Sequence, residues 1–246
     1  MSGAPLEGHV VAITGSSSGI GAATARAFAT AGAAVLVNSS RSVAEGEAVA
    51  ASLPDARYVQ GDITDPEFPD QLVAAALERW GRLDTLVNNA GTTAVIPHHD
   101  VAAASVEVWR RIFEVNVFGT WAMTVAALPA LREARGSVVN VASVAGVRPT
   151  GSSIPYAASK AALNHMTALL AKVVGPEIRV NAVAPGLVDT PWTQDWDVVR
   201  DAVRQAAPLK RSGRPEDVAE VILSLAGAAY VTGQVVVVDG GLTLVV

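Results

Sequence analysis

Tyr156 and Lys160 have the spacing that most directly suggests chemistry, because they stand four residues apart in the stretch YAASK. Residues four apart on a helix share a face, so both side chains can enter one cleft. A phenol has a pKa near ~10 and is inert at neutral pH. A unit cation about 4 Å away, at an effective dielectric near ~20, supplies roughly the 4 kcal/mol needed to bring that pKa to about 7. We therefore expect Tyr156 to exchange a proton with a substrate oxygen. The alternative, commoner for an isolated pair, is an interfacial tyrosine beside a solvated lysine.

A glycine-rich turn follows the apolar run 10–13 and leads into a helical pattern. It reads Thr14-Gly15-Ser16-Ser17-Ser18-Gly19-Ile20-Gly21. Glycines allow a tight turn and close approach to a pyrophosphate, and the N-terminus of the following helix attracts the anion. The spacing is G-x3-G-x-G rather than the common G-x-G-x-x-G, and no Gly-Lys-Ser/Thr follows, so a nucleoside triphosphate P-loop is not expected. A purely structural glycine turn is the alternative.

Apolar, β-branched runs alternate with longer helical patterns along the chain. The runs occupy residues 10–13, 34–37, 58–59, 86–87, 138–141, 180–183 and 235–238. Helices are expected at 19–31, 43–52, 66–80, 105–133, 154–174 and 215–225, the third capped by Thr64 or Asp65. Several runs lack alternation, which is typical of strands covered on both faces. The order predicts an α/β fold: a single Rossmann-type domain over 1–246, with a doubly wound parallel sheet and helices on both faces.

The composition restricts what the protein can be and bind. Of 246 residues, 50% are hydrophobic and 17% are charged, which excludes a disordered chain. The net charge of -5 argues against nucleic acid as a partner. The chain has no cysteine, so disulfides and thiolate metal sites are excluded. We interpret His98-His99-Asp100 as a solvated loop, so no metal is expected.

No segment has the pattern of a signal peptide or a membrane span. The N-terminus lacks a basic n-region, and its first apolar stretch, 10–13, is too short. A spanning helix needs about 20 apolar residues, whereas the best candidate, 118–131, is broken by Gly119 and Pro129. We therefore expect a cytoplasmic protein that does not enter a membrane.

Further motifs follow the glycine turn in a fixed order. They are Asn88-Asn89-Ala90-Gly91, then Asn116, Ser143, Tyr156 and Lys160, then Pro185-Gly186. Together with the turn they resemble the short-chain dehydrogenase/reductase family, over nearly the whole chain. The resemblance implies hydride transfer between a nicotinamide dinucleotide and a ketone or secondary alcohol, with Asn116, Ser143, Tyr156 and Lys160 as catalytic residues. A dinucleotide-binding sensor without turnover is the rival, since it could keep the glycines and lose those four residues.

The resemblance also implies a role for each catalytic residue. Tyr156 is the general acid or base, and an oxidised nicotinamide cation adds to the effect of Lys160. Ser143 hydrogen-bonds the substrate carbonyl oxygen, although a serine there can also cap a helix. It is not a nucleophile, because no G-x-S-x-G surrounds it. Asn116, a poor mid-helix residue near Gly119, holds a water in a proton relay from Lys160.

The residues after the second strand bear on which dinucleotide binds. NAD enzymes of this fold usually place Asp or Glu there, but here Ser39, Ser40 and Arg41 follow, with no acid until Glu45. These side chains suit a 2′-phosphate, so NADP is predicted and NAD is the alternative, in which Arg41 is merely solvated. The glycine turn lacks the basic residue of many NADP-using relatives. The expected cofactor contacts are Gly15, Ser17, Ser18, Gly19, Ile20, Gly21, Ser39, Ser40, Arg41, Asp62, Ile63, Asn89, Ala90, Gly91, Tyr156, Lys160, Pro185, Gly186, Val188 and Thr190.

The substrate is expected beneath a mobile lid at about 187–213. Trp192 and Trp196 stand four apart there, and they either face a bulky, apolar substrate or anchor the lid to the core. The expected pocket residues are Val95, Ile96, Ser143, Val147, Tyr156 and Trp192.

The identity of the substrate is left open. Many relatives reduce 3-oxoacyl groups on acyl carrier protein, an acidic partner that needs a basic patch. Arg132, Arg135 and Lys172 are candidates for that patch, but Glu133 and Glu177 interrupt it. A reductase of small ketones, or a secondary alcohol dehydrogenase, is equally admissible.

Self-association is also expected. The helices at 105–133 and 154–174 carry many alanines, which allow close helix packing, and a monomer would expose the apolar tail 242–246. The resemblance implies a homotetramer built through such helices and the last strand. The connection at 225–230 is about three residues shorter than is usual in the family.

Overall fold

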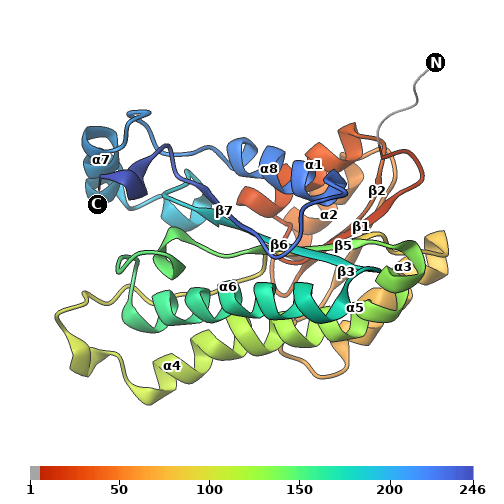
Figure 1. Cartoon of the computed structure of the whole chain (residues 1–246), viewed down its shortest axis with the longest axis horizontal. Helices are drawn as coiled ribbons and strands as arrows, with labels where there is room; N and C mark the ends of the chain where they lie inside the picture. Colours follow the sequence, from red (N-terminus) through yellow and green to blue (C-terminus); the bar gives the residue numbers. More distant parts are fainter. Residues whose placement is uncertain (1–5, 246) are drawn as a thin grey trace.

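A sheet of seven parallel strands runs through the centre of the molecule (Figure 1). The computed structural model describes residues 6–245, so Val246 of the predicted apolar tail lies outside the described residues. The strands are β1 (Val10–Ile13), β2 (Ala34–Ser39), β3 (Ala56–Gln60), β4 (Thr85–Asn88), β5 (Ser137–Val141), β6 (Arg179–Pro185) and β7 (Val235–Val238). Their spatial order is β3-β2-β1-β4-β5-β6-β7, so the direction of winding reverses between β1 and β4. Ligands of such folds bind at that reversal, beyond the carboxyl ends of the strands. The predicted fold class is confirmed.

Helices cover both faces of the sheet (Figure 1). One layer contains α1 (Gly19–Thr30), α2 (Val43–Ala51) and α8 (Pro215–Gly227). The other contains α3 (Phe68–Trp80), α4 (Val106–Phe113), α5 (Thr120–Ala134) and α6 (Ile154–Val174). Successive strand residues face opposite layers, so Val10 and Ala12 join one core while Val11 and Ile13 join the other. This explains why the strands are apolar without alternation.

A turn of π-helix joins α4 to α5. It covers Glu114–Gly119 and includes Asn116, where the sequence already indicated a weak point in the helix. A Cβ added to Gly119 would lie 2.8 Å from Cγ1 of Ile63, so the helix can approach the loop after β3 only with glycine there. The combined helix Val106–Ala134 is long and apolar enough to cross a membrane by composition. It is nevertheless a core helix, because Ile112, Met123 and Leu131 are fully buried.

The predicted start of α3 is wrong by two residues. The helix begins at Phe68 with Glu67 as its N-cap, and neither Thr64 nor Asp65 caps it. The carboxylate of Asp65 instead accepts a hydrogen bond from the backbone N–H of Glu67 (3.0 Å), which closes a local turn before the helix. Short-range hydrogen bonds of this kind compete with helix formation.

A buried carboxylate ties β1 to the start of β4. Asp84 is 5% exposed and accepts hydrogen bonds from the Val10 N–H (2.9 Å) and from Nε of Arg82 (2.8 Å). Val11 pairs with Thr85 in the adjacent ladder, so this contact helps to set the register at the point where the sheet reverses.

We expect Asp84→Ala to lower the free energy of unfolding by about 2–4 kcal/mol. The substitution leaves the buried N–H of Val10 without an acceptor and the guanidinium of Arg82 without its carboxylate. Urea denaturation measures the change. Glu78→Ala is the control: Glu78 forms an exposed ion pair with Arg57, which is worth at most about 1 kcal/mol. Equal losses for the two variants would contradict the role given to Asp84.

Candidate active site

A cleft of about 1040 Å³ opens at the carboxyl ends of the strands, where the winding reverses. It brings together the loops that follow β1, β2, β3, β4, β5 and β6. Nearly all of the predicted site residues line it, from the glycine turn to Thr190 and Trp192. The exceptions are Gly21, Asn116 and Val147.

The glycine turn is built for close backbone contact. Gly15 and Gly19 have positive φ angles of 62° and 53°, which favour glycine. A Cβ on Gly15 would lie 2.9 Å from Cα of Ala90, and a Cβ on Gly21 would lie 2.5 Å from the Gly15 carbonyl oxygen. Gly21 therefore serves packing inside the turn rather than lining the cleft. Ser18 does not cap α1 with its side chain, so the N–H groups of the first helical turn remain available to an anion.

Two asparagines fix this turn to its neighbours. Nδ2 of Asn89 donates to the carbonyls of Thr14 (3.0 Å) and Gly15 (2.8 Å). Asn38, at the end of β2, accepts from the Gly15 N–H (3.2 Å) and donates to the Gly61 carbonyl (3.0 Å). No role is expected for Asn38 from the sequence, although a polar residue directly after the apolar run 34–37 was the available signal.

The end of β2 carries hydroxyls and a cation. Ser39 is buried, donates to the Ser42 carbonyl and hydrogen-bonds the Tyr58 hydroxyl, each over 2.9 Å. Ser40 and Arg41 line the cleft. Within residues 6–245, Arg41 forms no ion pair with an acidic side chain.

Asn116 is 1% exposed and lies behind the cleft rather than in its wall. Its Oδ1 accepts from the Thr92 N–H (2.8 Å), and its Nδ2 donates to the Thr92 carbonyl and to Oγ of Ser159, both at 3.0 Å. The side chain thus ties the loop after β4 to the π turn and to α6.

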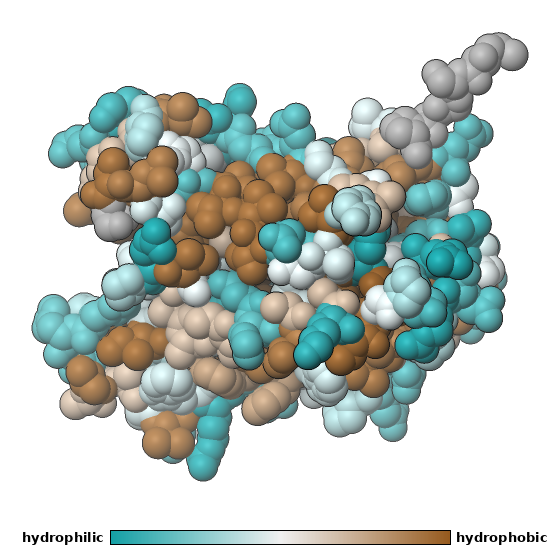
Figure 2. Space-filling view, in the orientation of Figure 1, coloured by the Kyte–Doolittle hydropathy of each residue, from teal (hydrophilic) through white to brown (hydrophobic). Residues whose placement is uncertain are grey.

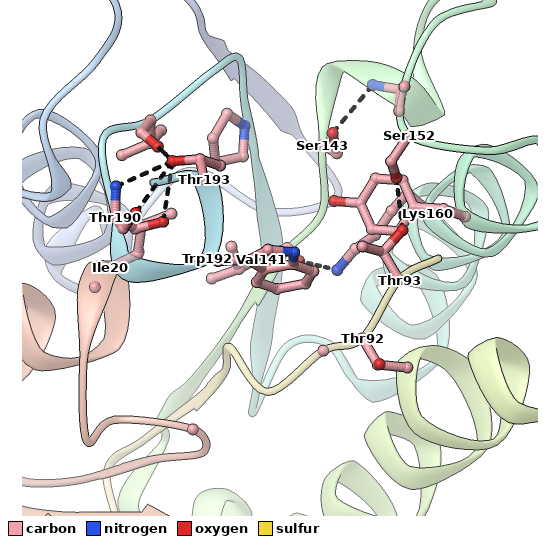
Figure 3. Close-up of a pocket in the computed structure, with 18 of the residues that line it drawn as sticks. Ile20, Thr92, Thr93, Val141, Ser143, Ser152, Lys160, Thr190, Trp192 and Thr193 are labelled. Atoms are coloured by element: carbon pink, nitrogen blue, oxygen red, sulfur yellow. Dashed lines mark hydrogen bonds between the residues drawn. The ribbon is translucent and has the colours of Figure 1, made fainter. Parts of the chain in front are cut away.

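Ser143, Tyr156 and Lys160 converge at the far end of the cleft; Figure 3 shows Ser143 and Lys160 on the same side of it. The Ser143 hydroxyl accepts from the Ala145 N–H (3.1 Å), so it caps a short 3-10 turn, Val144–Gly146, and it lies near enough to the Tyr156 phenol to lower its pKa. Lys160 is 4% exposed, and its Nζ donates to the Val141 carbonyl over 2.8 Å. The same nitrogen lies 5.9 Å from the centre of the Tyr156 ring.

The pKa values differ from the expectation drawn from spacing. Burial raises the pKa of Tyr156, and the Ser143 hydroxyl opposes that change only in part. Burial lowers the pKa of Lys160 to about 8. Desolvation therefore opposes the acidification of the phenol that the spacing predicts, and the Lys160 ammonium is itself held by the Val141 carbonyl.

The substrate end of the cleft has a mixed lining. The Trp192 ring meets Tyr156 edge-on, with centroids 6.5 Å apart. Oγ1 of Thr93 and Oγ of Ser152 hydrogen-bond at 2.5 Å, a pair the sequence did not reveal because the residues are far apart along the chain. Val147 is a correction: it follows the 3-10 turn, is partly exposed and does not line the cleft, whereas Pro149 to Ser152 do.

The predicted lid is fastened at its base by an ionic cluster. Arg200, on α7 (Asp197–Ala206), donates from Nε to Asp189 (2.8 Å) and from Nη2 to the Thr193 carbonyl (3.0 Å). Ser212 donates to the other oxygen of Asp189 over 2.7 Å. These bonds lower the pKa of Asp189 despite its partial desolvation. Only the folded chain brings 189, 200 and 212 together, so the sequence pattern did not show this cluster.

Comparison with known proteins gives concordant matches over almost the whole chain. A family model described as enoyl-(acyl carrier protein) reductase matches residues 15–243. A protein assigned as ketoacyl reductase 2 of the granaticin polyketide synthase of Streptomyces violaceoruber is 57% identical, over 96% of each chain. The 3-oxoacyl-(acyl-carrier-protein) reductase FabG of Thermotoga maritima is 40% identical, over 97% of this chain and 99% of its own. A crystal structure of a short-chain dehydrogenase/reductase, glucose/ribitol dehydrogenase, from Brucella melitensis superposes with a TM-score of 0.91 at 34% identity, and covers 98% of this chain and 99% of its own.

The buried ammonium predicts an unusual stability profile. We expect Lys160→Met to raise the free energy of unfolding at pH 7 by about 1–3 kcal/mol, because methionine fills the site without a desolvated charge. The pKa of Lys160 is lower in the folded protein than its ordinary 10.5, so the wild type gains stability as pH rises from about 8 towards 10.5. The advantage of the variant therefore shrinks over that window.

Urea denaturation between pH 6 and 10 measures this difference. Lys172→Met, at an exposed position on α6, is the matched control and should change stability by no more than about 0.5 kcal/mol. A Lys160→Met variant less stable than this control at pH 7 would show that Lys160 is not a desolvated charge.

Proposed function

The chain belongs to the short-chain dehydrogenase/reductase family, and we propose that it is an NADP(H)-dependent ketoreductase with Tyr156 as the general acid and base. Its relatives are named as reductases and dehydrogenases, and the family uses a nicotinamide dinucleotide, so hydride transfer at a CH–OH carbon is the reaction class. The observation that carries the finer proposal is that Ser143 and Tyr156 line the same cleft as a buried lysine.

The nucleotide end of the cleft fits a dinucleotide. The positive φ angles of Gly15 and Gly19, the close approach of Ala90 and the uncapped start of α1 form a backbone cradle for a pyrophosphate. Ser17, Ser18 and Ile20 line this cradle. Asp62 and Ile63 line the cleft beyond it, where we place the adenine.

The preference for NADP is supported by the end of β2. A carboxylate at Ser39 would favour NAD, but a buried hydroxyl with two internal hydrogen bonds occupies that position. Ser40 and Arg41 line the adjacent wall and offer a hydroxyl and a guanidinium to a 2′-phosphate.

The catalytic residues would divide the work as follows. When bound, the nicotinamide supplies or accepts the hydride. Ser143 and Tyr156 donate hydrogen bonds to the carbonyl oxygen, and Tyr156 gives it a proton during reduction. Burial keeps the phenol protonated, which suits an acid, and the ammonium of Lys160 stabilises the phenolate that remains.

Asn116 is proposed as the far end of the proton relay, as the family resemblance implies. Its side-chain amide is already committed to Thr92 and Ser159. A relay water at this position would therefore contact the backbone of Asn116 rather than its amide group.

The substrate is proposed to be a ketone, or the matching secondary alcohol. The family model is described as an enoyl reductase, but the hydroxyls of Ser143 and Tyr156 in one cleft suit the polarisation of a carbonyl. A 3-oxoacyl group on acyl carrier protein is the second candidate, favoured by the names of the two relatives. Arg132, Arg135 and Lys172 are exposed, but Glu133 is exposed next to Arg132 in the chain and Glu177 is half-buried, so these cations do not identify a carrier protein by themselves.

A homotetramer is proposed from exposed apolar side chains on the outer helices. Phe118 and Trp121 protrude near the start of α5, and Leu169 and Val173 protrude from α6. Figure 2 shows hydrophobic residues scattered over this lower layer of helices. Leu244, close to the C-terminus, is also exposed, as expected if a second copy covers it.

Tyr156→Phe should lower kcat/KM for ketone reduction with NADPH by at least about 100-fold while leaving NADPH affinity near that of the wild type, because it removes the proton donor and keeps the ring. A panel of simple ketones and 3-oxoacyl thioesters measures this in the wild type and the variant. Tyr230→Phe, at a fully exposed tyrosine, is the control. Full turnover in Tyr156→Phe would reject the assigned acid, and a wild type that binds NADPH without turnover would support the sensor.

Arg41→Ala should weaken NADPH binding about tenfold or more and leave NADH binding unchanged, since only the 2′-phosphate loses a charge-assisted hydrogen bond. Dissociation constants from fluorescence titration give the ratio. Arg26→Ala, at an exposed arginine of α1 that does not line the cleft, is the control. An unchanged preference in Arg41→Ala would remove this residue from the account.

A further inference from the structure

The turn that carries Trp192 lies across the cleft rather than at its side. A Cβ built on Gly19 would lie 3.2 Å from Cγ2 of Thr190. A Cβ built on Gly91 would lie 3.8 Å from Cη2 of Trp192. Gly19 starts α1 and Gly91 follows β4, so this short segment reaches both walls. Figure 3 shows the indole in the middle of the cleft, between Ile20 and Thr190 on one side and Lys160 on the other.

The indole covers the catalytic pair. Its ring meets Tyr156 at an interplanar angle of 72°. A Cβ built on Gly91 would lie 3.6 Å from Nζ of Lys160 as well as 3.8 Å from Cη2 of Trp192. Gly91, Tyr156 and Lys160 are among the residues expected to contact the cofactor. Trp192 lies against Gly91 and Tyr156, so a cofactor seated on these residues would meet the indole.

We propose that Trp192 is a gate for the cofactor: its side chain lies where the nicotinamide half binds, and binding requires the indole to swing out. The inference rests on the proposed binding of a dinucleotide. While it lies in the cleft, the indole helps to keep water from Lys160, which is 4% exposed.

The contacts of the turn allow the side chain to move while the backbone stays. Arg200 holds the Thr193 carbonyl, and the Thr193 hydroxyl donates to the Val188 carbonyl over 2.6 Å. Within residues 6–245 the indole N–H of Trp192 makes no hydrogen bond, and the residue is 47% exposed. Rotation about the side-chain torsions of Trp192 therefore breaks none of the bonds that hold the turn, and Thr190 keeps its place for the cofactor.

The rate of cofactor association tests the gate. In stopped-flow mixing with NADP, we expect Trp192→Ala to raise the association rate constant at least threefold, because no indole has to leave first. Trp80→Phe is the control, since Trp80 lies on α3, outside the cleft, and is not among the residues proposed for self-association. An association rate in Trp192→Ala equal to or below that of the wild type would overturn the gate.

Indole fluorescence, excited at a wavelength that oxidised NADP does not absorb, gives a second readout. Binding should change the emission of the wild type and of Trp80→Phe, as Trp192 leaves the side of Tyr156, and Trp192→Ala should lose most of that change. An equal change in Trp192→Ala would contradict the movement. If the wild type bound neither NADP nor NAD, the proposed function and the gate would fail together. If the wild type bound NADP, but Trp192→Ala showed neither the faster association nor the smaller emission change, the gate would be rejected and the proposed function would stand.

Discussion

A buried ammonium is the constraint on which the site depends. Lys160 is removed from water at the bottom of the cleft, and the Val141 carbonyl accepts a hydrogen bond from it. Placing a charge there is costly, so its environment must be held firmly. The end of β5 supplies the acceptor, α6 supplies the lysine, and the bond between Asn116 and Ser159 ties that helix to the π turn. The reversal of the sheet between β1 and β4 brings these parts to the same edge as the glycine turn.

The chemistry follows from what this environment does to two side chains. Burial keeps the Tyr156 phenol protonated and brings the pKa of Lys160 to about 8, close enough to neutral for the lysine to take part in proton exchange. Ser143 adds a second hydroxyl beside the phenol. The arrangement therefore suits the proposed reduction, in which the phenol would first be an acid and the lysine would stabilise the phenolate and restore its proton.

The sequence predicted what depends on local pattern. The fold was predicted from unbroken apolar strands such as Val10–Ile13. Most of the cleft lining was predicted from the glycine turn and from the polar residues beyond the strand ends. Distances across the cleft could not be predicted, because helical spacing puts Tyr156 and Lys160 on one face without fixing where Nζ points. The same limit explains the missed Thr93–Ser152 pair, the cluster around Asp189 and the outward position of Val147. The start of α3 was missed because short-range carboxylate turns replaced a helix cap.

Titration of the Lys160 side chain tests the central claim most directly. The chain has three lysines, Lys160, Lys172 and Lys210, so 15N-lysine labelling gives few side-chain signals, and the signal lost in Lys160→Met assigns the one of interest. The structure predicts that this nitrogen titrates with a midpoint near pH 8. A midpoint near its ordinary 10.5 would show that the Lys160 ammonium is hydrated, and would contradict an active site built around a buried ammonium.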